Sequence, residues 1–168
     1  MKRIFSSILS LLVLSVGVAL SENPHYKKPP SCSENGLTAT CTGSLAGLGP
    51  GNDDVLVRLS ASGTGTPFCR NPGNGNVIPG KNTVPVNVSG SLFVPASDIK
   101  NGNLFFMVPT QPPTDPSPQD AGCPNSSWIA SWTDGEIAPL DFRDGTLRVY
   151  EIDSILGVTL IISTSVMF

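Results

Sequence analysis

The chain has 168 residues, in which ten Lys and Arg face thirteen Asp and Glu to give a formal net charge of −3. The basic residues are scattered apart from Lys27 and Lys28, so the chain lacks the basic stripe that neutralises phosphates, and nucleic acid is excluded as a partner. Its 17 Gly and 16 Pro are too many for a helical protein and are typical of short strands joined by turns.

The first 21 residues have the pattern of a secretory signal peptide. Lys2 and Arg3 precede an uncharged, apolar run over residues 4–18, and small side chains follow it at the expected cleavage position. The run is shorter than the roughly 20 apolar residues of a membrane-spanning helix. We therefore expect the segment 1–21 to be removed and the mature protein to be secreted and extracellular, with no stable membrane insertion.

Residues 22–31 predict a flexible, extended leader. The segment has no apolar periodicity and contains two consecutive prolines, Pro29 and Pro30. His25, the one histidine of the chain, lies in this leader.

Beyond the leader, alternating apolar and polar side chains predict half-buried strands. The pattern holds over residues 37–42, 55–62, 83–94, 128–132, 147–150 and 158–168. The run 104–108 is apolar without alternation, which predicts a strand buried on both faces that pairs with the strand before it. Residues 63–80 predict a loop, and so does the Pro-rich stretch 109–118 inside the domain.

Together these elements predict an all-β fold. Turn signals recur between short strands, and no helical period of useful length interrupts them. We expect one domain over residues 32–168, an immunoglobulin-like β-sandwich of about seven to eight strands, with a small β-barrel as the alternative.

Four cysteines lie in the exported part, where disulfides form and persist: Cys32, Cys41, Cys69 and Cys123. Four cysteines allow three pairings, and the sequence alone does not choose between them. We favour 32–41, which closes a short loop at the start of the domain, and 69–123, which ties an early strand to the segment after the Pro-rich loop. A zinc site is the alternative, but Cys-x-x-Cys spacing is missing from the sequence, so neither a metal nor a cofactor is expected.

The sequence offers little for catalysis. His25 lies alone in the leader, and two disulfides would use every thiol, so we expect no catalytic residues. Carboxylates crowd the region after Trp132, which keeps a carboxylate-based glycosidase as an alternative. Asp141 and Asp144 in this region are weak candidates for calcium, as is the pair Asp53 and Asp54, but neither set has the spacing of a known calcium loop.

Aromatic and Asn residues supply the remaining candidates. Trp128, Trp132 and Tyr150 are of the kind that grips sugar rings, although the strand spacing of the two tryptophans favours the core. Asn87 and Asn125 each begin an Asn-x-Ser sequon and are candidate glycosylation sites.

Several segments carry a resemblance to a group of proteins. They are GLTATCTGSLAGLGPG from Gly36, DVLVRLSA from Asp54, CRNPGNG from Cys69 and GCPNSSW from Gly122. In these turn glycines, threonines and cysteines the chain resembles small, secreted, cysteine-containing, β-rich microbial proteins with no assigned activity. The resemblance implies a fold and carries over no functional residue.

The functional prediction is a secreted, non-enzymatic β-sandwich that acts by surface binding, at a host or cell-surface interface. Its expected partner is an extracellular protein or a glycan. The alternative is a carbohydrate-binding or carbohydrate-active module that uses acidic C-terminal loops together with Trp132.

Overall fold

The structure is a computed structural model that describes residues 23–49 and 53–168, so the predicted signal peptide lies outside the described residues. The described residues form an all-β protein with one short 3-10 turn. The strands are β1 (His25–Tyr26), β2 (Ser31–Asn35), β3 (Thr38–Ala46), β4 (Asp54–Gly65), β5 (Phe68–Arg70), β6 (Val77–Pro79), β7 (Val84–Val94), β8 (Leu104–Pro109), β9 (Ile129–Ser131), β10 (Leu140–Asp153) and β11 (Gly157–Met167), and the turn η1 (Ala96–Asp98) lies between β7 and β8.

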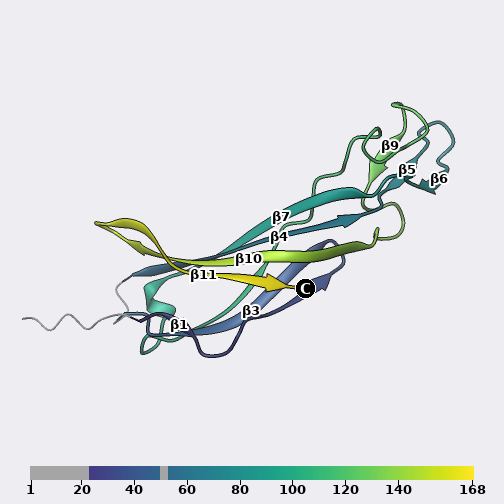
Figure 1. The fold of residues 1–168 in the computed structure, drawn as a ribbon. Helices are drawn as coiled ribbons and strands as arrows, with labels where there is room; N and C mark the ends of the chain where they lie inside the picture. The colour runs from purple at the N-terminus through teal and green to yellow at the C-terminus, as the bar shows by residue number, and fades with distance from the viewer. Residues whose placement is uncertain (1–22, 50–52) are drawn as a thin grey trace, which may run out of the picture.

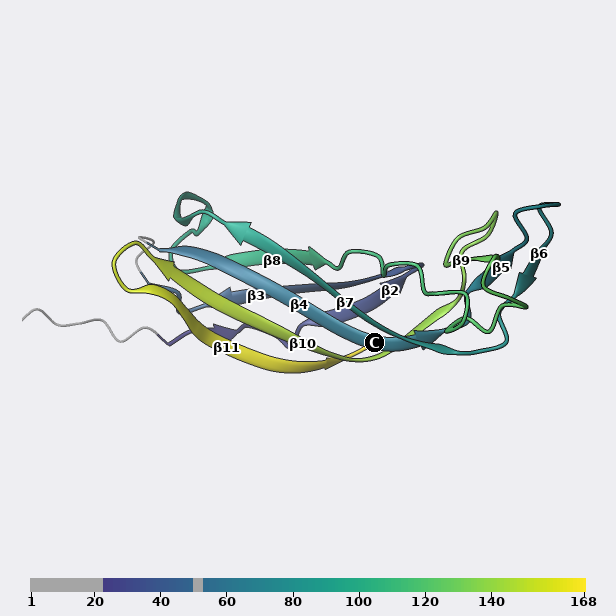
Figure 2. The same cartoon turned by 90° about the horizontal axis from the view of Figure 1, so that it is seen from above.

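Two antiparallel sheets make up the body of the molecule (Figures 1 and 2). The long sheet has the order β11-β10-β4-β7, with β4 paired along its whole length to β10 on one side and to β7 on the other. In the short sheet β3 is central, with β8 on one edge and β1 and β2 end to end on the other.

The two sheets share one core. Alternate side chains of the long sheet, such as Val57, Leu59 and Val149, are fully buried together with Leu45 and Phe106 of the short sheet. This is the period-2 burial that the alternating sequence pattern predicts, and it makes the two sheets the layers of a sandwich-like body.

A third, smaller sheet lies at one end of the molecule, at the upper right of Figure 1. This distal sheet has the order β6-β5-β9 and is built from two insertions, one between β4 and β7 and one between β8 and β10. The prediction of a loop over residues 63–80 is therefore wrong in part, because β4 continues to Gly65 and the short strands β5 and β6 follow. Strands of three residues are too short for their alternation to register in the sequence.

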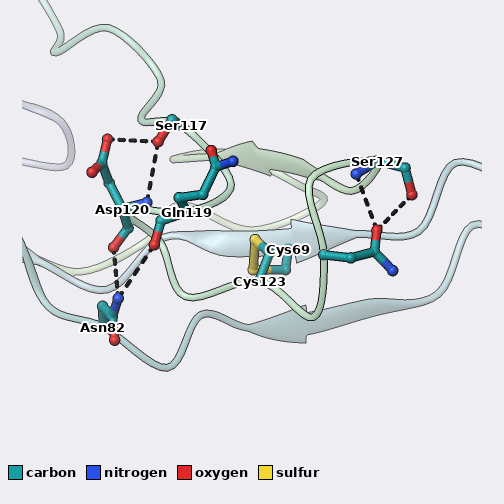
Figure 3. Close-up of a disulfide and its surroundings, with 8 residues drawn as sticks. Cys69, Asn82, Ser117, Gln119, Asp120, Cys123 and Ser127 are labelled. Carbon is teal, nitrogen blue, oxygen red and sulfur yellow. Dashed lines mark hydrogen bonds between the residues drawn. A yellow bond between two sulfur atoms is a disulfide. The ribbon is translucent and has the colours of Figure 1, made fainter.

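Both disulfides have the pairing that the sequence analysis favours. Cys32 and Cys41 are bonded across the β2–β3 pair, where they are direct register partners. Cys69 of β5 is bonded to Cys123, in the segment after the Pro-rich loop, and Figure 3 shows this bridge with the turns around it. Every cysteine of the described residues is bonded, so none is a free thiol.

The N-terminal segment differs from the predicted leader. His25 and Tyr26 form β1 and pair with the end of β3. The Tyr26 ring packs against Phe106 at a centroid distance of 6.4 Å, and β2 already begins at Ser31. Tyr26 makes apolar contact with the core, and this contact holds the segment against the short sheet. The segment is too short for a periodic pattern of apolar residues to predict it from the sequence.

The prediction for residues 104–108 is wrong in two respects. β8 is buried on one face only, since Phe106 is 1% exposed whereas the neighbouring Phe105 is 70% exposed. It pairs with β3 and not with β7, because the corner at η1 carries the chain from the long sheet to the short one. Asp54 stabilises this corner by accepting a hydrogen bond of 2.9 Å from the Ala96 backbone N–H.

After β8 the chain crosses back over the edge of β7. Thr110 is buried and its hydroxyl accepts a hydrogen bond from the Ala39 N–H, while the Gln111 N–H donates to the Ser89 carbonyl at 2.9 Å. The crossing requires Gly90, because a Cβ there would lie 1.9 Å from the Pro109 carbonyl oxygen. It brings the Gln111 backbone beside the outer surface of the long sheet.

The Pro-rich stretch 109–118 lies inside the domain, and no regular structure follows the end of β8 within it, as the sequence analysis predicts. It is anchored by Trp132, whose indole Nε1–H donates to the Thr114 carbonyl at 2.9 Å and whose backbone N–H donates to Asp115 at 2.8 Å.

Candidate functional site

The outward side chains of the long sheet form a surface that we call the outer face. Strand register aligns these side chains in rows that cross β7, β4, β10 and β11 in that order. The rows are Phe93, Leu56, Tyr150 and Leu160; then Ser91, Arg58, Arg148 and Ser163; then Ser89, Ser60, Thr146 and Ser165; then Asn87, Ser62, Asp144 and Met167. The outer face therefore changes from apolar, through basic, to a field of hydroxyl groups.

Two arginines stand side by side at the centre of this face. Arg58 and Arg148 are direct cross-strand partners on the two central strands, and both are exposed. The Arg58 guanidinium lies over the Tyr150 ring, 5.9 Å from its centroid. Opposed like charges destabilise a sheet, so this pairing is not explained by stability.

Neither arginine is neutralised within the described part of the chain. The ion pairs found there join Arg70 to Asp134 at 3.1 Å and Arg143 to Asp141 at 3.0 Å. The row of Arg58 and Arg148 and the row after it hold only Ser and Thr besides the arginines themselves. The pair is thus a local positive charge on a chain whose net charge is negative.

A shallow depression of about 480 Å³ lies over this pair. It is lined by Arg58, Arg148, Ser60, Ser89, Ser91 and Gln111. Gln111 reaches the depression because the chain crosses β7 at Gly90. The floor of the depression is therefore sheet surface, and one of its walls comes from the loop after β8.

A second depression lies beside the distal sheet and is lined by Asn82, Gln119 and Asp120 among others. Figure 3 shows that its polar groups bond to one another: the Asn82 amide donates to the Gln119 and Asp120 carbonyls, and the Ser117 hydroxyl donates to the Asp120 carboxylate at 2.6 Å. Lys81 also lines this depression, but it is a single exposed cation that shares the depression with the Asp120 carboxylate. We favour the outer face because two cations are direct cross-strand partners there and no carboxylate lines the depression over them.

The calcium candidates Asp141 and Asp144 lie in β10, so the expectation that they occupy acidic C-terminal loops is wrong. A bulge between Phe142 and Asp144 interrupts the alternation of apolar and polar residues while β10 continues through it. The sequence pattern therefore places the start of this strand too late, after the acidic stretch. Asp141 is ion-paired with Arg143. Over residues 23–49 and 53–168, no group of three His, Cys, Asp or Glu side chains is arranged to hold a metal ion.

The aromatic candidates separate into core and surface. Trp132 is 2% exposed and packs in the main core, as predicted, so it is not available to a ligand. Trp128 is half-buried against the Cys69–Cys123 cluster of the distal sheet. Tyr150 is the one of the three that lies on the outer face.

Both sequon asparagines are exposed. Asn87 points outward from β7 at the far end of the outer face, which meets the condition for glycan attachment at a strand position. Asn125 lies in a turn, where its side-chain oxygen accepts hydrogen bonds from the Ser127 N–H and hydroxyl.

Two titratable groups near the long sheet have shifted pKa values. The Asp153 carboxylate accepts hydrogen bonds from the Leu156 and Ile155 N–H groups in the β10–β11 turn, and these lower its pKa. Burial raises the pKa of Tyr26, with a smaller opposing effect from the Thr164 hydroxyl. Neither group touches the arginine pair, so the two shifts reflect turn and core structure.

Comparison with protein-family models, with curated proteins and with solved structures finds no match to this chain. None of the helical segments in the described residues has the length and apolar character needed to cross a bilayer.

The arginine pair was not among the residues selected from the sequence. Arg58 and Arg148 are 90 positions apart, and each reads as a single polar residue in an alternating strand. The register of β4 against β10 is what brings them together, and a sequence pattern gives no access to it.

Proposed function

We propose that this protein is a secreted, non-enzymatic protein that works outside the cell by surface binding, and that the outer face is its binding surface. The observation that carries the proposal is the exposed Arg58–Arg148 pair, unneutralised by any described side chain, between an apolar row and hydroxyl rows. A polar surface kept only for solubility would mix charges of both signs.

The outward surface of the short sheet is the competing candidate. It carries Thr40, Thr42 and Ser44 on β3, next to the exposed Phe105 and Met107 of β8. Lys27 is the charged residue beside these positions, since its backbone N–H donates to the Ser44 carbonyl at 3.0 Å. No two charged residues are register partners along β3, so this surface lacks the cross-strand pair of like charges that distinguishes the outer face.

A bulky side chain at the centre of each surface tests the proposal. Ser60→Trp places an indole on the outer face, and Thr42→Trp, at a similarly half-buried outward position, is the matched control on the short sheet. Labelled mature protein is measured by flow cytometry on cultured cells and on a glycan array. We expect saturable binding that S60W abolishes and T42W retains; absence of saturable binding, or equal binding by S60W, would refute the proposal.

Carbohydrate binding is the second candidate function. It is favoured by the half-buried Tyr150 and the 54%-exposed Phe93, which lie in one row next to the row of the arginines, since sugar rings pack an apolar face on aromatic rings. Trp132, which the sequence suggests for this role, is buried and does not reach the surface. Replacing Asp141 and Asp144 by Asn tests the hydrolytic alternative, because any measured glycosidase activity that this double change removes would rule out a non-enzymatic protein.

We propose further that the sandwich is immunoglobulin-like. Two antiparallel sheets packed over a shared core that contains Trp132 support this class, whereas the Cys32–Cys41 bridge joins neighbouring strands of one sheet and so differs from the inter-sheet bridge of antibody domains. Nuclear Overhauser contacts between β3 and β8 backbones are expected. A continuous ladder between β7 and β8 would instead favour the closed barrel.

A further inference from the structure

We infer that Arg58 and Arg148 bind an oxyanion, a carboxylate or sulfate group carried on a sugar ring. The inference rests on the proposed function and names the chemical class of ligand for the outer face. It follows from the charge, the donors and the shape of the surface around the two guanidinium groups.

The two guanidinium groups supply both the positive charge and the hydrogen-bond donors that an oxyanion needs. Each guanidinium presents a fixed fork of N–H donors that fits a carboxylate or sulfate, and two forks on directly opposed residues converge on one space. The contact of Arg58 with the Tyr150 ring already restricts the rotamers of the arginine. Less side-chain entropy is therefore lost when a ligand binds. An anion between the two also relieves their mutual repulsion, so the apo surface favours its capture.

The surroundings determine what kind of anion fits. In β10 the first acidic residue toward the hydroxyl field is Asp144, two rows from Arg148, so the depression itself holds no carboxylate. Ser60, Ser89 and Ser91 surround it with neutral hydroxyl groups. Two positive charges on a chain of net negative charge suit a single carboxylate or sulfate group better than a polyphosphate, whose further charges would be repelled.

The apolar row gives a reason to place the anion on a sugar. Adjacent rows are about 6.7 Å apart, because outward residues alternate along a strand, and this spacing is comparable with one pyranose ring. Because Arg58 lies over the Tyr150 ring, a sugar ring with its acidic group on the arginines would rest on Leu56 and the 54%-exposed Phe93 of the same row, and its hydroxyls would reach Ser91. A free inorganic anion would leave the apolar row unused.

The direct test is titration calorimetry on the mature protein. The probes are a glucuronate-containing oligosaccharide and a sulfated one, each with its neutral counterpart (carboxyl-reduced or desulfated), and inorganic sulfate alone. We expect one or both acidic oligosaccharides to bind and the neutral counterparts to bind at least tenfold more weakly, since the charge-assisted hydrogen bonds are lost. The two acidic probes distinguish the carboxylate source from the sulfate source.

Variants assign the binding to these side chains. R58Q and R148Q are each expected to weaken binding about tenfold and the double variant more, whereas the double lysine variant, which keeps the charge and loses the fork, should be intermediate. The matched control is R70Q with R143Q, which removes two positive charges that are already ion-paired. Higher salt should weaken wild-type binding, because the site is exposed.

Stability separates a binding role from a structural one. R148Q removes the like-charge pair and leaves Arg58 over Tyr150, so its Tm should equal or exceed that of the wild type. A lower Tm would show that Arg148 is kept for the fold and would count against the inference.

The outcomes distinguish this inference from the proposed function. If S60W abolishes binding while R58Q/R148Q binds as well as the wild type, the surface is correct and the oxyanion inference is wrong. If an acidic probe binds but neither change affects it, both proposals fail. Binding of inorganic sulfate as tightly as the sulfated sugar would overturn the assignment to a sugar.

Discussion

Loss of the Cys69–Cys123 disulfide is expected to open the distal sheet while the two main sheets stay folded. The cluster inside the distal sheet is small: Cys69, Ala121 and Ala130 are its buried members, with Ile78 and Trp128 half-buried beside them. So little apolar area contributes little stability of its own, and the bridge must supply much of the rest. The perturbation is the double variant C69A/C123A.

The magnitude follows from the loops that the two bridges close. A sequence separation of 54 residues removes about 4.2 kcal/mol of unfolded-chain entropy in the simple model, and the separation of 9 between Cys32 and Cys41 removes about 2.6 kcal/mol. If the stabilisation of about 4.2 kcal/mol from the Cys69–Cys123 bridge is lost from the distal sheet alone, the protection of its amides against exchange falls by about a thousandfold.

Hydrogen exchange read by mass spectrometry is the assay, with C32A/C41A as the matched control. The variant C69A/C123A should lose protection over β5, β6 and β9 and keep it in β3 and β4. In the control, whose bridge lies in the main core, the free energy of global unfolding should fall and the distal strands should exchange by local opening as before. A loss below tenfold in the distal strands, or an equal loss in β3 and β4, would refute the reasoning.

Three further changes test the core, the chain crossing and the β10–β11 turn. Phe106→Ala should cost about 3–5 kcal/mol in chemical denaturation because the ring is buried, whereas Phe105→Ala on the same strand should be nearly neutral. Gly90→Ala should cost about 1–3 kcal/mol, since its Cβ would clash with backbone, and Ser91→Ala should not. Asp153→Ala should lower Tm at neutral pH, and this difference should shrink as pH falls below about 3.8, because a depressed folded pKa stabilises only while the group is ionised; a pH-independent difference would contradict that origin.

Sequence periodicity predicts the strands well where one face is buried. Val55, Val57 and Leu59 alternate with polar residues and are fully buried, and Cys41 lies inward from β3 as the Thr alternation requires. The same rule fails at residues 104–108, where Phe105 continues the apolar run although it faces solvent. An apolar residue on a surface is common enough that composition alone does not reveal which face is inside.

Pairing is the part that the sequence does not supply. The corner at η1 takes the chain from β7 to β8, which pairs with β3, and the long crossing after β8 leads to β10, which pairs with β4. At these two places the pairing partner is a strand far away in the chain. The candidate site depends on that pairing, because Arg58 and Arg148 become a pair only in this register. The spacing of the two tryptophans indicates the core correctly for Trp132, which is 2% exposed, but not for Trp128, which is half-buried against the distal sheet.

The position of β4 at the middle of the long sheet has a consequence for how the chain folds. One edge of β4 pairs with β7, which follows the first distal insertion. The other edge pairs with β10 at residues 140–153, so it stays unpaired until the intervening segment 95–139 has been brought into place. Closing so long a loop costs entropy before any ladder hydrogen bond compensates for it, which places this protein among the slow folders dominated by distant contacts. Because β11 pairs only with β10 among the described strands, it can join the long sheet only after β10 has done so, and the other edge of this uncharged strand has no partner strand in the described residues.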